Sequence, residues 1–216
     1  MKSVLVTGGT VRLGKAIAER LRAEGWRVIT SSHRTDAGAD IVADLAEPMG
    51  PAKLYAAALQ ILGGMPPDAL VNNAALFTGD AATIAAVNLE APKKLTMLMA
   101  GRETGVGAIV NILDTKALDA YRRLPTPTDA YLVSKREFAA YTRASAATFA
   151  ATLRVNGVAP GPVLAPTDVH VKAGETLIDR RPTADDVAAA VSYLLDAESV
   201  TGTVIPVDAG QHLVEV

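Results

Sequence analysis

The sequence predicts a doubly wound α/β fold, in which a parallel β-sheet is covered by helices on both faces. Short apolar runs rich in β-branched residues alternate along the chain with longer alanine-rich stretches of helical period. Strands that are apolar along their whole length are typical of parallel sheets buried on both faces. The Asn156-Gly157 pair lies inside an apolar run rather than between two strands, which argues against hairpins.

The predicted elements alternate from one end of the chain to the other. A β-branched strand at 3–6 comes first, and an amphipathic helix over 13–24 follows it. The later elements are, in order, strands 27–30 and 40–42, helix 51–62, strand 69–71, helix 81–101, strand 108–113, helix 129–151, strand 152–158, helix 183–196 and strand 204–207. No repeat or low-complexity linker interrupts the series, so a single domain is expected over residues 1–216.

Composition excludes several classes of protein. Half of the 216 residues are hydrophobic and the formal net charge is −2, so neither disorder nor a basic surface for nucleic acid is expected. There is no cysteine, and the three histidines are too far apart for a paired-ligand motif, so no metal site is expected. No segment resembles a targeting signal or approaches the roughly 20 apolar residues of a membrane span, which favours a cytoplasmic protein.

A glycine-rich turn, TGGTVRLG over residues 7–14, connects the first strand to the first helix. Glycine in such a turn lets the backbone approach the pyrophosphate of a dinucleotide, whose charge is favoured at a helix N-terminus. Gly8, Arg12, Leu13 and Gly14 are therefore candidate cofactor contacts. An ordinary tight turn is the alternative.

A basic segment ends the second strand, where sites for NAD usually carry an acidic residue. His33, Arg34 and Thr35 offer an imidazole, a guanidinium and a hydroxyl. These groups suit the 2′-phosphate of NADPH, and Arg12 is expected against the same phosphate or the adenine. A solvated basic loop is the alternative.

Polar and small residues also follow the third and fourth strands. Asp44 and Leu45 come after the third strand, and Asn73, Ala74 and Ala75 come after the fourth. Ligands of open α/β sheets bind at these carboxyl ends of the strands, so all five are candidate cofactor contacts, with Asp44 accepting from the adenine amine. Each could equally cap a loop.

Tyr131 and Lys135 are four residues apart in a predicted helix and so share one face. The ammonium, aided by a cationic nicotinamide, is expected to favour the phenolate and make Tyr131 a proton donor near neutral pH. Asp114 adds a carboxyl group at the end of the strand 108–113, and Asn88 is expected to hold a water that relays protons to Lys135. A simple surface pair is the alternative for Tyr131 and Lys135.

Together these residues resemble the short-chain dehydrogenase/reductase family over almost the whole chain. The likeness rests on the Thr-Gly turn, Asn72-Asn73-Ala74, the Tyr131/Lys135 pair, Pro160-Gly161-Pro162 and Val207-Asp208-Ala209-Gly210. It implies a Rossmann fold and cofactor contacts that include Tyr131, Lys135, Pro160 and Gly161, with Lys135 binding the nicotinamide ribose. It also implies a homotetramer assembled through the long helices 81–101 and 129–151.

Four details resemble the pteridine reductase and dihydromonapterin reductase branch. Arg12 replaces the usual middle glycine of the turn, His33-Arg34-Thr35 is similar to the branch's NADPH signature, and Asp114 replaces the customary catalytic serine. Phe77 stands where the branch stacks an aromatic ring on a pterin. The resemblance implies a pterin between nicotinamide and Phe77, with Asp114 and Tyr131 handling protons; a core aromatic is the alternative for Phe77.

Some features depart from that branch. Asp114 and Tyr131 are separated by 17 positions, and the longer loop includes residues 121–123 and 125–127. A serine beside the pterin is replaced by Ala75, and the substrate segment after Pro162 is short, with Thr167, Asp168, His170 and Lys172 as its polar groups. These departures keep two alternatives open beside a pterin reductase: an NADPH-dependent carbonyl reductase of a small ketone or sugar, and a non-catalytic NADPH-sensing module.

Overall fold

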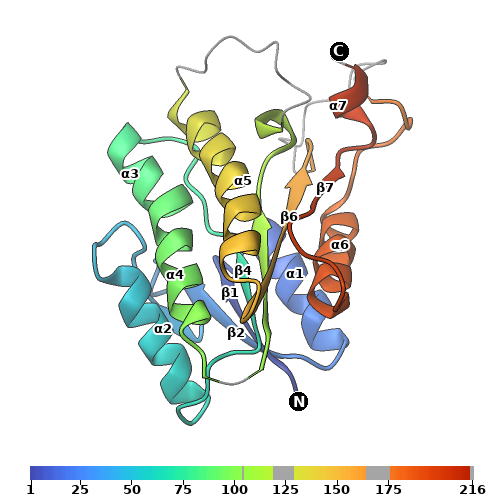
Figure 1. Cartoon of the computed structure of the whole chain (residues 1–216). Helices are drawn as coiled ribbons and strands as arrows, with labels where there is room; N and C mark the ends of the chain where they lie inside the picture. The colour runs from blue at the N-terminus through green and yellow to red at the C-terminus, as the bar shows by residue number, and fades with distance from the viewer. Residues whose placement is uncertain (104, 119–128, 164–175, 215–216) are drawn as a thin grey trace.

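A seven-stranded sheet forms the centre of the molecule (Figure 1). The computed structural model describes residues 1–103, 105–118, 129–163 and 176–214. The strands are β1 (Ser3–Thr7), β2 (Arg27–Ser32), β3 (Ile41–Val42), β4 (Ala69–Asn72), β5 (Gly107–Ile112), β6 (Leu153–Pro160) and β7 (Val204–Val207). They lie in the order β3-β2-β1-β4-β5-β6-β7, and all six pairings are parallel. The predicted doubly wound parallel fold is confirmed.

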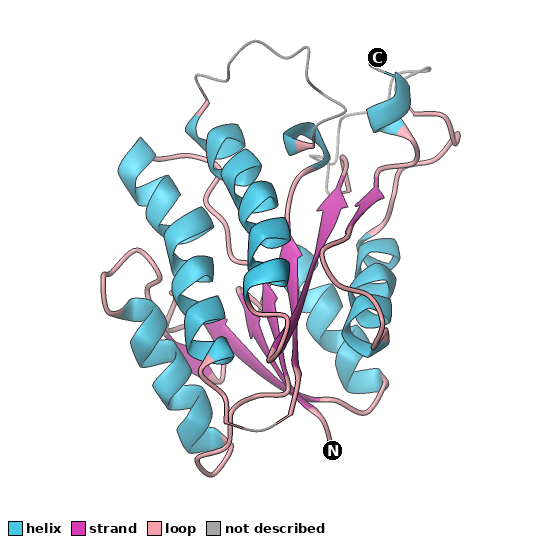
Figure 2. Cartoon of the chain, in the orientation of Figure 1, coloured by secondary structure: helices cyan, strands magenta, loops and turns pink. Residues whose placement is uncertain are grey.

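Helices connect the strands and cover both faces of the sheet (Figure 2). They are α1 (Arg12–Ala23), α2 (Gly50–Ile61), α3 (Ala81–Ala85), α4 (Ala91–Ala100), α5 (Ala130–Thr148), α6 (Ala184–Asp196) and α7 (Gln211–Val214). The helix expected over 81–101 is divided between α3 and α4 by a π-helical turn, η1 (Ala86–Glu90). A 3₁₀ turn, η2 (Thr115–Ala117), and the short α7 were not predicted.

Side chains of each strand alternate between two hydrophobic cores. Val4 and Val6 point to the core that α1 and α6 cover, whereas Leu5 points to the core under α2 and α4. This alternation follows from the two-residue period of a strand. Since both faces are buried, consecutive positions such as Val4, Leu5 and Val6 are all apolar, which is the pattern that predicted a parallel sheet.

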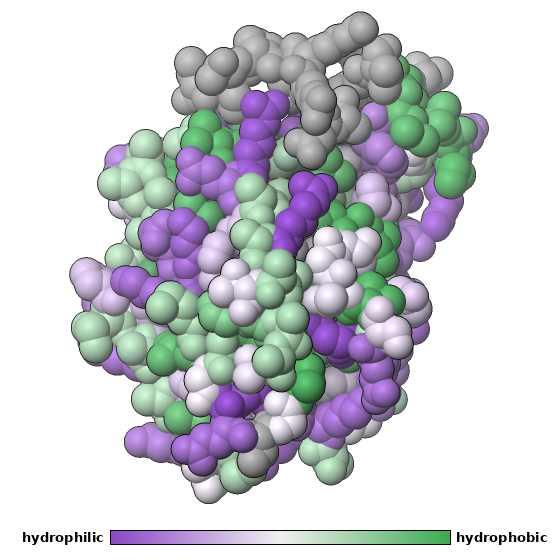
Figure 3. All heavy atoms as spheres, viewed as in Figure 1, coloured by the Kyte–Doolittle hydropathy of each residue, from purple (hydrophilic) through white to green (hydrophobic). Residues whose placement is uncertain are grey.

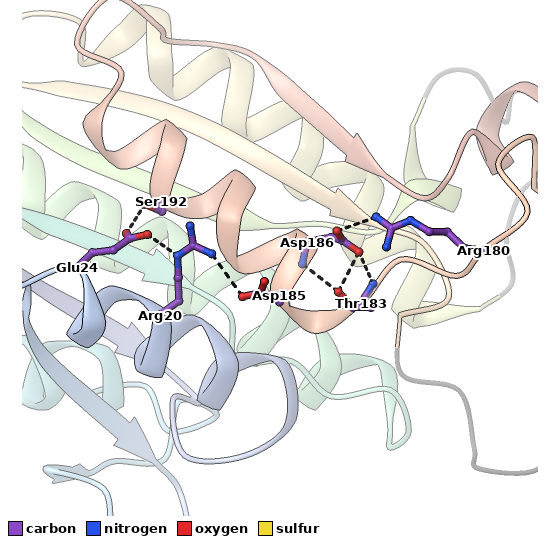
Figure 4. A network of polar contacts seen from close by, with 7 residues as sticks. All are labelled: Arg20, Glu24, Arg180, Thr183, Asp185, Asp186 and Ser192. Atoms are coloured by element: carbon purple, nitrogen blue, oxygen red, sulfur yellow. Dashed lines mark hydrogen bonds and ion pairs between the residues drawn. The ribbon is translucent and has the colours of Figure 1, made fainter.

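A polar network joins α1 to α6 on one outer layer (Figure 4). Arg20 contacts Glu24 on its own helix and Asp185 on α6, and Ser192 of α6 donates to Glu24. At the start of α6, Thr183 caps the helix. The contacts of Arg20 and Ser192 connect the two helices, with Ser192 buried between them.

The carboxyl ends of the strands form one edge of the sheet, next to α7 in Figure 1. Figure 3 shows a group of hydrophobic residues at the upper right, and Leu213 and Val214 of α7 are among the exposed aliphatic side chains. Among the helices that the structure describes, none is both long and apolar enough to cross a bilayer.

Candidate active site

Asp114 and Tyr131 meet at the carboxyl edge of the sheet. Asp114 follows β5, and Tyr131 lies in the first turn of α5, where Asp129 caps the helix by accepting from the Tyr131 backbone N–H. The Tyr131 hydroxyl donates to Asp114 Oδ2 at 2.9 Å. Asp114 is therefore within reach of Tyr131 despite the longer loop between them, of which residues 121–123 and 125–127 lie outside the described part of the chain.

Lys135 lies on α5, four residues after Tyr131, and is buried, with 2 % of its surface exposed. Its Nζ donates to the Ile112 carbonyl at 2.7 Å and lies 5.9 Å from the centre of the Tyr131 ring. Burial lowers the pKa of the Lys135 ammonium to about 8, although the Asp114 carboxylate acts in the opposite direction. The ammonium is thus the form present at neutral pH.

The pKa of the Tyr131 phenol moves in the direction opposite to the one expected. Burial raises this pKa, and the nearby Asp114 carboxylate raises it further by repulsion and by accepting the phenol's hydrogen bond. Without a cofactor the expected preference for the phenolate is wrong, because burial and the Asp114 carboxylate both favour the protonated phenol. Tyr131 therefore holds its proton and is available as a donor.

Asn88 binds the backbone of the loop that follows β4. It lies in the π-helical turn η1, and its Oδ1 accepts from the Leu76 N–H at 2.7 Å. Its Nδ2 donates to the Leu76 carbonyl at 2.9 Å and to Ser134 Oγ at 3.1 Å. Ser134 in turn donates to the Tyr131 carbonyl at 2.7 Å. Both amide hydrogens of Asn88 are thus used, and the water relay to Lys135 stays a prediction.

Ser134 is a buried residue of this cluster that the sequence analysis missed. It connects the loop of Leu76 to the helix of Tyr131 through Asn88. The signal was its place three residues after Tyr131, which puts it on the same side of α5.

Phe77 stacks on Tyr131. The two ring centres are 4.7 Å apart with an angle of 29° between the planes. Phe77 is 65 % exposed, so the alternative that it is a core aromatic is wrong. An exposed aromatic ring beside the Tyr131 hydroxyl offers a flat apolar surface to a planar substrate.

The glycine turn is compact and tied to β4. Gly8 has a φ of +63°, and a Cβ on Gly14 would lie 2.1 Å from the Gly8 carbonyl oxygen, so the close approach of helix and turn requires glycine there. Asn73 supports the turn by donating from Nδ2 to the Thr7 carbonyl at 2.9 Å. Arg12 also has a positive φ of 49°, which explains why glycine is the usual residue at this position.

The basic segment after β2 is exposed, as a phosphate site requires. His33, Arg34 and Thr35 are all exposed. Arg34 donates from Nε and Nη2 to the two carboxylate oxygens of Asp36, at 2.9 and 2.7 Å. Asp36 is thus a neighbour that the sequence analysis missed, and its carboxylate contacts Arg34 with the two-point geometry that a phosphate would use.

The remaining candidate cofactor residues lie along the same edge of the sheet. Asp44 accepts from the Ala46 N–H at 2.8 Å, which is a loop cap, and Leu45 is buried in the core under α2 and α4. Leu13 packs against the opposite core, and Ala74 packs beside Leu45's core. Their contacts with a cofactor, and those of Ala75, stay predictions.

Gly161 follows β6, whose last residue, Pro160, is buried. A Cβ on Gly161 would lie 2.6 Å from Asp208 Cβ and 3.4 Å from Gln211 Oε1. That Gln211 oxygen is buried and has no hydrogen-bond partner. An unsatisfied acceptor at this edge suits the carboxamide N–H group of a nicotinamide, so the residues present fit a dinucleotide.

One set of sequence predictions cannot be placed. The proposed polar groups of the substrate segment, Thr167, Asp168, His170 and Lys172, lie outside the described residues. Within the described ranges, no group of three or more His, Cys, Asp or Glu side chains is arranged to hold a metal ion.

The known proteins that this chain resembles are described as reductases. A family model described as Enoyl-(Acyl carrier protein) reductase matches residues 11–212. The granaticin polyketide synthase putative ketoacyl reductase 2 of Streptomyces violaceoruber is 31% identical over 97% of this chain and 95% of its own. Pteridine reductase 1 of Leishmania tarentolae is 28% identical over 97% of this chain and 96% of its own. The crystal structure of FolM alternative dihydrofolate reductase 1 from Brucella canis, complexed with NADP, has a TM-score of 0.85 at 32% identity and covers 98% of this chain and 94% of that one.

Proposed function

This chain belongs to the short-chain dehydrogenase/reductase family, and we propose that it is an NADPH-dependent reductase of a pterin. The reaction transfers hydride to a C=N or C=O bond of a substrate of the dihydromonapterin, dihydrobiopterin or dihydrofolate type. The observation that carries the proposal is the exposed Phe77 ring beside the Tyr131–Asp114 hydrogen bond. An aromatic surface, a carboxylate acceptor and a phenol donor together match a planar heterocycle that carries N–H groups.

The cofactor assignment is supported by three features of the chain. The glycine turn with its positive φ at Gly8 leads into α1, whose N-terminus favours a pyrophosphate. Gln211 offers an unsatisfied acceptor beside Gly161. Arg34, just after β2, supplies a cation for a 2′-phosphate, and the similar Brucella canis enzyme has been crystallised in complex with NADP.

The side chains of this chain have distinct parts in the proposed reaction. The reduced nicotinamide, when bound, supplies a hydride. Tyr131 donates the proton from its hydroxyl to the reduced substrate, and Lys135, held by the Ile112 carbonyl, provides the positive charge beside the phenolate that is left. Asp114 accepts from Tyr131 and from the substrate's N–H groups, and so orients both. Asn88 and Ser134 position the loop that carries Phe77.

A second candidate keeps the cofactor but changes the substrate to a small ketone or sugar. The similarity to a putative ketoacyl reductase favours it. Asp114 argues against it, because an ionised carboxylate cannot donate to a ketone oxygen, whereas it accepts readily from a pterin's N–H groups. A non-catalytic NADPH-sensing role does not require the proton donor that Tyr131 provides.

The test is the oxidation of NADPH with the three dihydropterins, with a small ketone and with a keto sugar, each repeated with NADH. Turnover with a pterin and preference for NADPH are expected. Phe77→Leu should raise the KM for the pterin about 5- to 10-fold through loss of ring stacking. Phe77→Tyr, the matched control, keeps an aromatic ring and should keep the wild-type KM. Turnover of only the ketone or sugar would select the second candidate, and tight NADPH binding without any turnover would favour sensing.

We also propose that the protein is a homo-oligomer, a tetramer by family resemblance. Met97 of α4 and Val133 of α5 are exposed, at 63% and 37%, and both belong to the long helices expected to form the contact. Light scattering coupled to size-exclusion chromatography tests this, and a monomer at micromolar concentration would contradict it.

A further inference from the structure

A buried carboxylate at the end of β7 has no part in the chemistry described so far. Asp208 is 2 % exposed. Its oxygens accept from the Thr115 hydroxyl at 2.6 Å, the Gly210 N–H at 3.0 Å and the His212 backbone N–H at 2.9 Å. The Nδ1 atom of His212 lies 2.8 Å from the same carboxylate. Because an ionised carboxylate only accepts, Nδ1 of His212 carries a proton.

The hydrogen bonds keep this carboxyl group ionised. Burial alone would raise the pKa of Asp208, but the hydrogen bonds from Thr115 and His212 outweigh burial and hold the pKa below its usual value. The buried Asp208 carboxylate is thus ionised and accepts hydrogen bonds from Thr115, Gly210 and His212.

Asp208 reaches Thr115 across an intervening strand. β6 lies between β5 and β7 in the sheet, and the chain leaves β6 at Gly161. A Cβ on Gly161 would lie 2.6 Å from the Cβ of Asp208 and 2.9 Å from its Cα. The missing side chain of Gly161 therefore allows Asp208 to pack there and accept from the Thr115 hydroxyl.

Thr115 is the residue after Asp114 and is 1 % exposed. It begins η2, and the two oxygens of Asp114 accept from the Lys116 N–H of that turn, at 2.8 Å, and from the Tyr131 hydroxyl, at 2.9 Å. The orientation of Asp114 toward Tyr131 therefore depends on where η2 lies. The Thr115–Asp208 hydrogen bond ties η2 to the end of β7, 93 residues along the chain.

We propose that Thr115 and Asp208 are positioning residues that keep the Asp114 carboxylate within hydrogen-bond distance of the Tyr131 hydroxyl. The inference rests on the proposed function, because it assigns them a part in the same proton transfer. Asp208 acts through Thr115, and His212 keeps the carboxylate in the rotamer that faces Thr115. A reacting group displaced by about 1 Å can cost on the order of 100-fold in rate, so the loss of one buried hydrogen bond here should be visible in kcat.

The experiment compares Thr115→Val with Thr115→Ser. Valine keeps the volume and removes the donor, whereas serine keeps the donor. We measure kcat and KM with NADPH and a dihydropterin, the Kd of NADPH from its fluorescence, and the Tm. Thr115→Val should lower kcat by about 10- to 100-fold with the NADPH Kd changed by less than about 2-fold, and Thr115→Ser should restore most of kcat.

Thr142→Val is the matched control. Thr142 is also fully buried, and its hydroxyl accepts from Asn111 at 3.0 Å and donates to the Phe138 carbonyl at 2.8 Å. It makes no hydrogen bond to η2 or Asp208 among those the structure describes. Thr142→Val should lower the Tm through the loss of buried hydrogen bonds and leave kcat within about 2-fold of wild type.

The outcomes separate the inference from the proposed function. A wild-type protein that oxidises no NADPH with any substrate would overturn both. An active wild type whose Thr115→Val variant keeps kcat, or whose Thr115→Ser variant is equally impaired, would overturn the positioning pair alone. If Thr115→Val does not fold, Asp208→Asn replaces it: a loss of kcat at constant NADPH Kd supports the pair, and an unchanged kcat overturns it.

Discussion

Two parts of the proposed site, one for proton transfer and one for the 2′-phosphate, are built in opposite ways. Tyr131 and Asp114 are hydrogen-bonded to each other, and Lys135 is 2 % exposed, with its ammonium bound to the Ile112 carbonyl. At the end of β2, the Arg34 side chain is 61% exposed and contacts Asp36, only two residues away.

The difference follows from the cost of burying polar groups. A buried polar group without a partner costs about 1–3 kcal/mol, so the cluster around Tyr131 is held in place by contacts from several strands and helices. An exposed ion pair contributes little net free energy because water and salt screen it, so Arg34 can leave Asp36 for a phosphate at little cost. Substitutions in the buried part should therefore change rates, and those in the exposed part should change affinity and its dependence on salt.

Tyr131→Phe should give the largest effect. Loss of the proton donor should lower kcat by about 10²–10⁴-fold, whereas the Kd of NADPH, measured by fluorescence, should remain near the wild-type value. Tyr141→Phe is the control, since this half-buried tyrosine of α5 donates a long hydrogen bond, 3.5 Å, to the Lys93 carbonyl and has no contact with Asp114 among those the structure describes. A Tyr131→Phe variant with the wild-type rate would disprove the assignment.

The pH dependence should come from Lys135 and not from Tyr131. The pKa of Lys135 is about 8, so kcat/KM should fall as pH rises above 8, by up to about 10-fold per pH unit, while the raised pKa of Tyr131 keeps the phenol protonated. Stability should move the other way. The folded pKa of Lys135 lies below its ordinary 10.5, so the unfolded chain binds more protons between those values and the contribution of Lys135 to stability rises with pH there.

The measurement is a pH–rate profile recorded beside the Tm over the same range, with Lys135→Arg as the variant whose charge does not titrate. Residual activity of that variant should lack the alkaline fall. A fall of activity that follows a fall in Tm would show unfolding rather than the titration of Lys135.

Arg34→Gln tests the exposed part of the site. Loss of the guanidinium should raise the Kd of NADPH by about 10-fold and leave the Kd of NADH unchanged, since NADH has no 2′-phosphate. The wild-type Kd of NADPH should also rise with salt, and this dependence should weaken in the variant. Arg27→Gln, at the other end of β2, is the control. Equal losses for both nucleotides would mean that Arg34 does not contact the phosphate.

Asp36→Asn should give the smallest effect, with the opposite sign. Removal of the carboxylate that occupies Arg34 should lower the Kd of NADPH by about 2- to 3-fold, in keeping with the small free energy of an exposed ion pair. Isothermal titration calorimetry with both nucleotides measures this. A higher Kd for NADPH would indicate instead that Asp36 holds Arg34 in its binding orientation.

Most of the fold could be predicted from the pattern of apolar residues. Each predicted strand is present, with ends that differ by at most two residues, as at β2 and β6. The interruption of the helix expected over 81–101 by η1 was not predicted, because a π-helical turn changes hydrogen-bond register and leaves the apolar spacing almost unaltered.

The sequence by itself determined which strand ends carry polar residues, and the carboxyl ends of parallel strands necessarily share one edge of the sheet. The glycine turn and Asp114 could be assigned to that edge for this reason, and Tyr131 and Lys135 to the helix that comes after Asp114. Only the tertiary structure decided that Phe77 lies on Tyr131, that burial and Asp114 raise the phenol pKa, and that Asp208 reaches Thr115. Burial and such contacts depend on segments far apart in the chain, so local spacing carries no information about them.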